Sequence, residues 1–300
     1  MPELPEVETV KKGLEEILVN NTIKGINLSG FSLRFPIPKN FASLVSGKKI
    51  VSIGRRAKYI LFNLSENISI ISHLGMSGSY RILGSEESKG YKASKHDHII
   101  FQFEGFKVVY NDPRRFGYVF ITDKDPNDHK LIASLGPEPL TNNFNEIVLA
   151  KSFYKKERPI KNALLDQNII SGLGNIYVCE ALFRSKINPK RKIKQLVYSN
   201  GSAKKPLIIL KEKINEVIKE SILLGGSSLK DFSNTEGKMG YFQNTFSVYG
   251  REGEFCILKD CDQKIKKITQ AGRSTFYLSL IHISEPTRLR RISYAVFCLK

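Results

Sequence analysis

The second and third residues of the chain, Pro2 and Glu3, form a pair that could carry out covalent chemistry. Removal of Met1 would leave Pro2 with a free secondary amine, which can attack an aldehyde-level carbon and form a positively charged iminium. The carboxylate of Glu3 could move protons beside that amine. The same two residues also suit a plain helix start, where proline is favoured. Both interpretations stay open on these residues alone.

The residues that follow predict the element that positions this pair. Val7, Val10, Leu14 and Leu18 recur at helical spacing, so we expect one amphipathic helix over residues 5–18. A helix N-terminus carries a partial positive charge. An amine placed there would have a lowered pKa and would be held in its neutral, nucleophilic form.

The composition indicates the class of partner. Among 300 residues, 47 are Lys or Arg and 29 are Asp or Glu, for a net charge of +18. A basic excess of this size favours a polyanion, most simply nucleic acid, although an anionic membrane surface would suit the charge alone. The chain has no apolar run long enough to cross a membrane and no signal peptide. We therefore expect a cytoplasmic protein, in which cysteines are poor candidates for disulfides.

The hydrophobic pattern changes along the chain and predicts an α+β fold. Short β-branched and aromatic runs separated by turn residues are typical of a β-sandwich or barrel, and we expect strands at residues 50–53, 59–62, 68–71, 98–101 and 107–110. Helical periodicity follows, clearest over residues 207–224. The expected parts are residues 1–130, a linker at 131–145, a helical region at 146–240 and a hairpin module at 241–277.

Several ordered motifs together resemble the formamidopyrimidine-DNA glycosylases. They are the opening MPELPEVETV, RRAKY at 55–59, HLGMSG at 73–78, KHDH at 95–98, NDPRRFG at 111–117 and GLGNIY at 172–177. The resemblance implies an N-terminal catalytic β-sandwich, a helix–two-turn–helix DNA-binding domain and a C-terminal zinc-finger hairpin. It also implies a monomeric, bifunctional DNA glycosylase and abasic-site lyase. Such an enzyme excises 8-oxoguanine and formamidopyrimidines from double-stranded DNA in base excision repair.

Catalytic roles follow from the same resemblance. Pro2 is expected to attack the sugar's anomeric carbon and Glu3 to transfer protons during base loss. Lys58 would assist β-elimination, and Arg273 the δ-elimination that follows. In isolation, a lysine at a strand end such as Lys58 would be taken for a solvated charge.

The resemblance also implies a set of DNA contacts. An apolar and aromatic wedge would fill the space left by an extruded base, and polar residues would bind phosphate. The wedge would consist of Met76, Arg114 and Phe116, and the other contacts of His96, Lys156, Lys161 and Asn175. Residues 227–242 resemble the loop that closes over the damaged base.

The C-terminal end departs from the family pattern. Cys256 and Cys261 would form the first cysteine pair of a structural Zn²⁺ site, but no Cys-x-x-Cys follows Tyr277. Instead, residues 278–288 and 292–299 read as translated sequencing adapter and flow-cell primer, so we interpret 278–300 as a non-native tail. Because a structural zinc site needs four ligands, we expect zinc to be lost or weakly bound and the hairpin that carries Arg273 to be less stable.

Two other functions were weighed against this one. An endonuclease VIII-like glycosylase for oxidised pyrimidines typically begins PEGPE, whereas this chain reads PELPE. A non-catalytic DNA-binding relative would have lost Pro2, Glu3 or Lys58, and all three are present.

Overall fold

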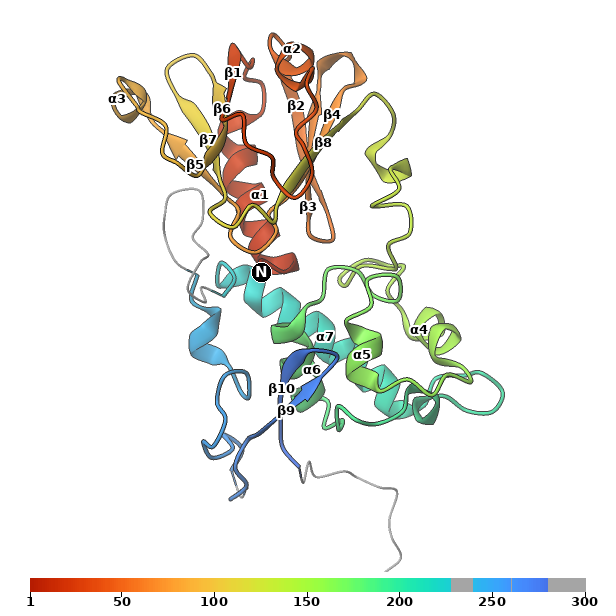
Figure 1. Cartoon of the computed structure of the whole chain (residues 1–300). Coiled ribbons are helices and arrows are strands. Elements are labelled where there is room, and N and C mark those ends of the chain that lie inside the picture. The colour runs from red at the N-terminus through yellow and green to blue at the C-terminus, as the bar shows by residue number, and fades with distance from the viewer. Residues whose placement is uncertain (228–239, 260, 280–300) are drawn as a thin grey trace, which may run out of the picture.

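Two antiparallel four-stranded sheets form the N-terminal part of the protein, as the computed structural model shows for the described residues 1–227, 240–259 and 261–279 (Figure 1). The first sheet has the order β1–β6–β7–β5, with bounds Gly25–Leu28, Asp97–Gln102, Lys107–Asn111 and Ser79–Leu83. The second has the order β2–β3–β4–β8, with bounds Ile50–Arg56, Tyr59–Leu64, Ser69–His73 and Tyr118–Thr122. The expected α+β class is confirmed.

Helix α1 (Leu4–Leu18) joins the two parts of the molecule. Val7, Val10 and Leu14 on its buried face share one apolar core with residues of both sheets. Leu4, one turn earlier, lies in the separate core of the helical part. Because a single rigid helix contributes to both cores, its first turn is fixed at their junction, where Figure 1 places the N-terminus.

The helical part is built around α7 (Lys205–Leu223), whose residues Leu207, Leu210, Ile214 and Val217 are fully buried. The helices that pack in the same core or border it are α4 (Glu146–Phe153), α5 (Ile160–Leu164), α6 (Asn175–Arg184) and the 3₁₀ turn η3 (Ile193–Leu196). Smaller elements elsewhere are α2 (Phe41–Val45), α3 (Ser85–Ser88), η1 (Ser65–Asn67), η2 (Pro126–Asp128) and η4 (Phe242–Thr245). Within the described part of the chain, none of the helices is long and apolar enough to span a membrane.

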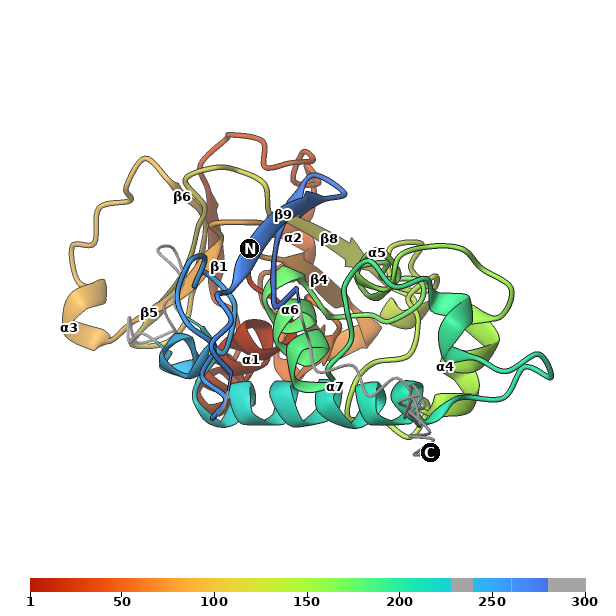
Figure 2. The ribbon, with the colours of Figure 1, turned by 90° about the horizontal axis from the view of Figure 1, so that it is seen from below.

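A short hairpin of β9 (Lys266–Gln270) and β10 (Arg273–Tyr277) packs against α6 (Figure 2). Its two-residue turn has positive φ at both Ala271 (48°) and Gly272 (69°), which matches the twist of the flanking strands. The preceding segment is anchored by Glu180 of α6. This buried carboxylate accepts backbone N–H groups of Ser247, Val248 and Tyr249, each at 2.9 Å.

Candidate active site

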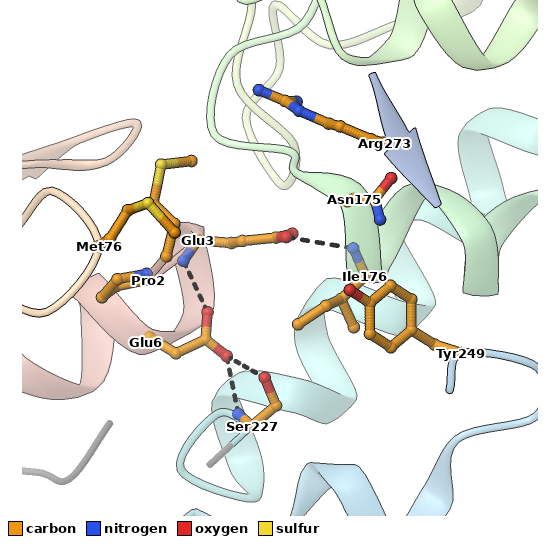
Figure 3. A pocket seen from close by; sticks show the side chains of 10 residues that line it. Pro2, Glu3, Glu6, Met76, Asn175, Ile176, Ser227, Tyr249 and Arg273 are labelled. Atoms are coloured by element: carbon orange, nitrogen blue, oxygen red, sulfur yellow. Dashed lines mark hydrogen bonds between the residues drawn. The ribbon is translucent and has the colours of Figure 1, made fainter. Parts of the chain in front are cut away.

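A cavity of about 380 Å³ opens where α1, the helical part and the hairpin meet (Figure 3). Its lining contains five of the residues selected from the sequence: Pro2, Glu3, Met76, Asn175 and Arg273. These residues come from distant segments of the chain. Figure 3 shows Pro2 and Glu3 on one side of the space and Arg273 on the other.

Glu3 is held by the helix starts on both sides of the junction. Its backbone N–H donates to Oε2 of Glu6 at 2.9 Å, and its Oε1 accepts the N–H of Ile176 at 3.1 Å. The second carboxyl oxygen, Oε2, is buried and has no hydrogen-bond partner among the described residues. A side chain at Gly174 would place its Cβ only 2.2 Å from the Glu3 carboxyl carbon, so this turn needs glycine.

Burial raises the pKa of Glu3 from 4.5 to about 7, against the opposing effect of the positive charge of Lys58. The charge of Glu6 raises it further, and the N–H bond from Ile176 lowers it. A carboxyl group with this pKa is populated in both protonation states near neutral pH. It can therefore both donate and accept a proton, as a general acid–base must.

Lys58 occupies the two-residue turn between β2 and β3 and is also buried. Burial lowers its pKa, and the charge of Arg273 lowers it further, whereas Glu3 and Glu6 raise it. Lys58 does not line the cavity. The charges of Glu3 and Arg273 nevertheless act on its pKa, so the predicted catalytic groups lie close enough to interact electrostatically. A lysine with a lowered pKa gives up its proton more readily than an exposed one.

Arg273 is the first residue of β10 and is exposed at the hairpin turn, next to the cavity. The strand behind it is fixed by two side chains of the helical part. Lys161 Nζ and Asn175 Nδ2 both donate to the carbonyl oxygen of Ser274, at 2.9 and 2.8 Å. The guanidinium is therefore presented from a backbone that is held at the next residue.

Lys161, expected as a phosphate contact, is engaged by the hairpin in this structure. Lys161 is fully buried, and its ammonium group also donates to Thr275 Oγ1 at 2.5 Å. A lysine in a helical sequence is normally expected to be exposed to solvent. Here two oxygen acceptors of the hairpin, the Ser274 carbonyl and Thr275 Oγ1, bind its ammonium group instead. Asn175 lines the cavity, but its amide nitrogen is likewise engaged by the hairpin.

The turn that carries Met76 packs against the turn that carries Arg114 and Phe116. A Cβ at Gly75, where φ is +63°, would lie 2.3 Å from the backbone of Phe116 and Gly117, so the turns can approach only through glycine. Asp112, fully buried, accepts Ser77 Oγ–H at 2.6 Å and Gly117 N–H at 2.8 Å. Above this base the side chains of Arg114 and Phe116 are exposed, with the guanidinium carbon 5.0 Å from the ring centroid.

The other two predicted DNA contacts lie away from the cavity lining. Lys156 is exposed in the segment after α4. His96 is half-buried just before β6, and its carbonyl accepts the N–H of Asp112 at 2.9 Å. His98, which pairs with it in the KHDH motif, is buried, and its ring contacts Ser29 Oγ and the Asp112 carbonyl. The motif is therefore structural around His98 rather than a metal cluster.

The residues present do not fit a four-ligand zinc site. Burial raises the pKa of the Cys256 thiol, and a hydrogen bond with Cys261 raises it further, so the two cysteines are neighbours. The position where a third thiol is expected holds Leu278, buried in an apolar cluster with Cys261. In the described ranges, no group of three or more His, Cys, Asp or Glu side chains is placed to hold a metal ion. Residues 280–300, most of the predicted tail, lie outside those ranges.

Three lining residues were not given a role from the sequence, Glu6, Ile176 and Tyr249, whereas Ser227 begins the segment expected to close over the base. The spacing of Glu3 and Glu6 offered a signal, because a carboxylate three residues after a helix N-cap bonds back to its N–H. Glu6 also accepts both N–H and Oγ–H of Ser227, at 2.7 and 2.9 Å, and the hydroxyl of Tyr177. Ile176 and Tyr249 are uncharged and carry no pattern of their own.

The two-part α+β fold brings Pro2 and the buried carboxyl group of Glu3 into one cavity, with the buried Lys58 nearby, and comparison with known proteins places this arrangement among the DNA glycosylases. The family model for the formamidopyrimidine-DNA glycosylase N-terminal domain matches residues 1–119, and that for the H2TH domain matches residues 135–233. The chain belongs to the formamidopyrimidine-DNA glycosylase family.

Individual relatives agree with this assignment. The formamidopyrimidine-DNA glycosylase of Agrobacterium fabrum is 47% identical over 293 residues, covering 92% of this chain and 98% of the relative. That of Rhizobium etli is 48% identical over 290 residues, with the same coverage. A Lactococcus lactis Fpg structure with abasic-site DNA matches with a TM-score of 0.82 at 35% identity, covering 93% of this chain and 99% of that one.

Substitution of Glu3 tests its raised pKa. A buried acid whose folded pKa exceeds its unfolded value makes stability fall as pH rises from 4.5 to about 7. Glu3→Gln cannot ionise, so we expect it to be more stable than the parent by up to about 3 kcal/mol at pH 8 and equal to it below pH 4.5. Urea unfolding at both pH values measures this. Glu16→Gln on the exposed side of α1 is the control, and a pH-independent gain for Glu3→Gln would refute the raised pKa.

Two lysine substitutions separate a structural from a DNA-binding role. Lys161→Met removes its hydrogen bonds to the Ser274 carbonyl and to Thr275 Oγ1, so we expect a loss of about 1–3 kcal/mol in unfolding free energy with no change in the salt dependence of DNA affinity. Lys156→Met should leave stability unchanged and reduce the salt slope by about 0.9. Equal slopes in the two variants would contradict the assignment of Lys161 to the hairpin.

Proposed function

We propose that this protein excises oxidised purines, such as 8-oxoguanine and formamidopyrimidines, from double-stranded DNA and then cleaves the strand at the abasic site. The observation that carries the proposal is the cavity that gathers Pro2, Glu3 and Arg273 beside the buried Lys58. The net charge of +18 suits a polyanionic duplex. The bacterial relatives and the Lactococcus lactis complex with abasic-site DNA support it, and the site of action would be the nucleoid in the cytoplasm.

The first step is nucleophilic. After removal of Met1, the nitrogen lone pair of Pro2 attacks the anomeric carbon, and the glycosidic bond breaks with its electron pair leaving on the base. The expelled base takes up a proton, and the Pro2 nitrogen gives up its N–H proton. A proton delivered to the ring oxygen then opens the sugar as the nitrogen lone pair turns the Pro2–carbon bond into an iminium. Glu3 supplies and recovers these protons through Oε2, which is free of protein partners in the described structure.

Strand cleavage follows from the iminium, which acidifies the neighbouring carbon–hydrogen bond. Loss of that proton breaks the 3′ carbon–oxygen bond, with Lys58 as proton donor in β-elimination. Arg273, across the cavity from Pro2, assists the second elimination on the 5′ side (Figure 3). The product is a one-nucleotide gap. Met76, Arg114 and Phe116 would fill the duplex where the base was removed.

Borohydride reduction tests the nucleophile. The chain should be trapped covalently on 8-oxoguanine DNA, and Pro2→Gly, which leaves a primary amine, should reduce trapping at least about tenfold. Lys11→Met, on the same helix, is the control. Equal trapping of Pro2→Gly and the parent would rule out Pro2, and faster trapping on an oxidised-pyrimidine duplex would favour the endonuclease VIII-like alternative.

We further propose that a complete hairpin of this sequence binds one structural Zn²⁺ through Cys256, Cys261 and a second Cys pair. The variant Leu278→Cys/Ile281→Cys restores four thiolates, which hold zinc at tetrahedral positions. Zinc measured by atomic absorption should rise from none to one per chain, and chelator should lower Tm only in this variant. Leu278→Ser/Ile281→Ser controls for the lost leucine packing; no zinc in the double-cysteine variant would contradict the proposal.

A further inference from the structure

Glu138, in the segment between the sandwich and α4, is a buried carboxylate outside the cavity. Its Oε1 pairs with Arg55 Nη2 at 2.7 Å, and its Oε2 pairs with Arg56 Nη1 at 3.2 Å. Oε2 also accepts the backbone N–H of Ala57 at 2.6 Å. A buried carboxylate with these three donors is rigidly placed, and its loss would leave two arginines without their shared acid.

The peptide that Glu138 holds is a strained one. Ala57 has φ of +52°, a conformation that costs a residue other than glycine about 1–2 kcal/mol. Ala57 and Lys58 are the two residues of the β2–β3 turn, so the conformation of Ala57 sets the direction in which Lys58 leaves the backbone. Strain of this kind persists only where neighbouring contacts over-determine the turn.

The same arginines reach the rest of the junction. Arg55 Nε donates to Glu8 of α1 at 2.6 Å, one helix turn and a half from Pro2 and Glu3. Arg56 donates to Ser171 Oγ at 2.8 Å and to the carbonyl of Gly136 at 2.7 Å. The network therefore connects α1, the β2–β3 turn, the interdomain segment and the turn before α6.

We propose that Glu138 is a positioning residue for Lys58, which it holds at a fixed place relative to Pro2 and Glu3 across the junction of the two parts. This inference rests on the proposed function, because the task of Lys58 is the proton transfer of β-elimination. Glu138 itself touches no reacting atom. Its effect is expected on the elimination step rather than on formation of the iminium.

The experiment uses Glu138→Gln on duplex DNA with a preformed abasic site. Single-turnover strand cleavage should slow by about tenfold or more, as misplacement of a catalytic group does, while borohydride trapping and DNA affinity change by less than about threefold. The pH profile adds a separate readout. Removal of a carboxylate charge alone would lower the pKa of Lys58, whereas a turn that opens to water raises it. We expect the decline in cleavage rate that accompanies deprotonation of Lys58 to occur at a higher pH than in the parent.

Controls make the outcomes distinct. Glu146→Gln removes the same charge from a partly exposed ion pair with Lys211 and should cleave like the parent. If Glu138→Gln does not fold, Ser171→Ala removes one hydrogen bond to Arg56 and no charge, and about threefold slower cleavage with unchanged trapping is expected. The inference would be overturned if the variant that folds cleaves as fast as the parent. It would also be overturned if trapping and cleavage fall by the same factor. Absence of trapping by the parent would instead refute the proposed function.

Discussion

The docking of the first turn of α1 against the turn before α6 is the interaction on which the rest of the site depends. Leu4 N–H donates to the Gly172 carbonyl at 3.1 Å, and Glu3 accepts the N–H of Ile176. Gly172, with φ of +88°, packs on Leu4, so no side chain fits between the two turns. Because α1 continues into the sandwich core, this contact fixes the chain's N-terminus and the mutual placement of both parts at once.

Buried carboxylates carry much of this architecture in a strongly basic protein. Glu6, Glu138 and Glu180 are each buried and each accept several N–H or O–H groups, which offsets the cost of removing a charge from water. Glu3 differs, because one of its oxygens has no partner in the described residues and its pKa is raised to about 7. The exception falls at the carboxyl group for which the proposed mechanism requires proton exchange with the substrate, and its free oxygen leaves room for that exchange.

Periodicity predicted α1, α7 and five of the strands, because apolar side chains recur there with a clear period. It missed the other three strands of the sandwich, β1, β5 and β8, each of which is only four or five residues long. Pro2, Glu3, Met76 and Arg273 were predicted together through the family resemblance and do converge on one cavity. Glu138 and Glu180 were missed because their partners are backbone N–H groups and arginines brought together only by the fold. For the same reason, the burial of Lys161 was not visible in the sequence.

The two ends of the hairpin serve different purposes: one carries Arg273 and the other lies beside the cysteines. Arg273 stands at the turn end of β10, where Lys161 and Asn175 hold the carbonyl of the next residue. Leu278 and Cys261 lie in the apolar cluster at the other end of that strand, roughly 16 Å away along an extended chain. Neither cysteine takes part in the described contacts that hold the backbone beside Arg273. A zinc ion at the cysteine end would therefore stabilise the module as a whole, while the backbone next to Arg273 is held locally by two side chains of the helical part.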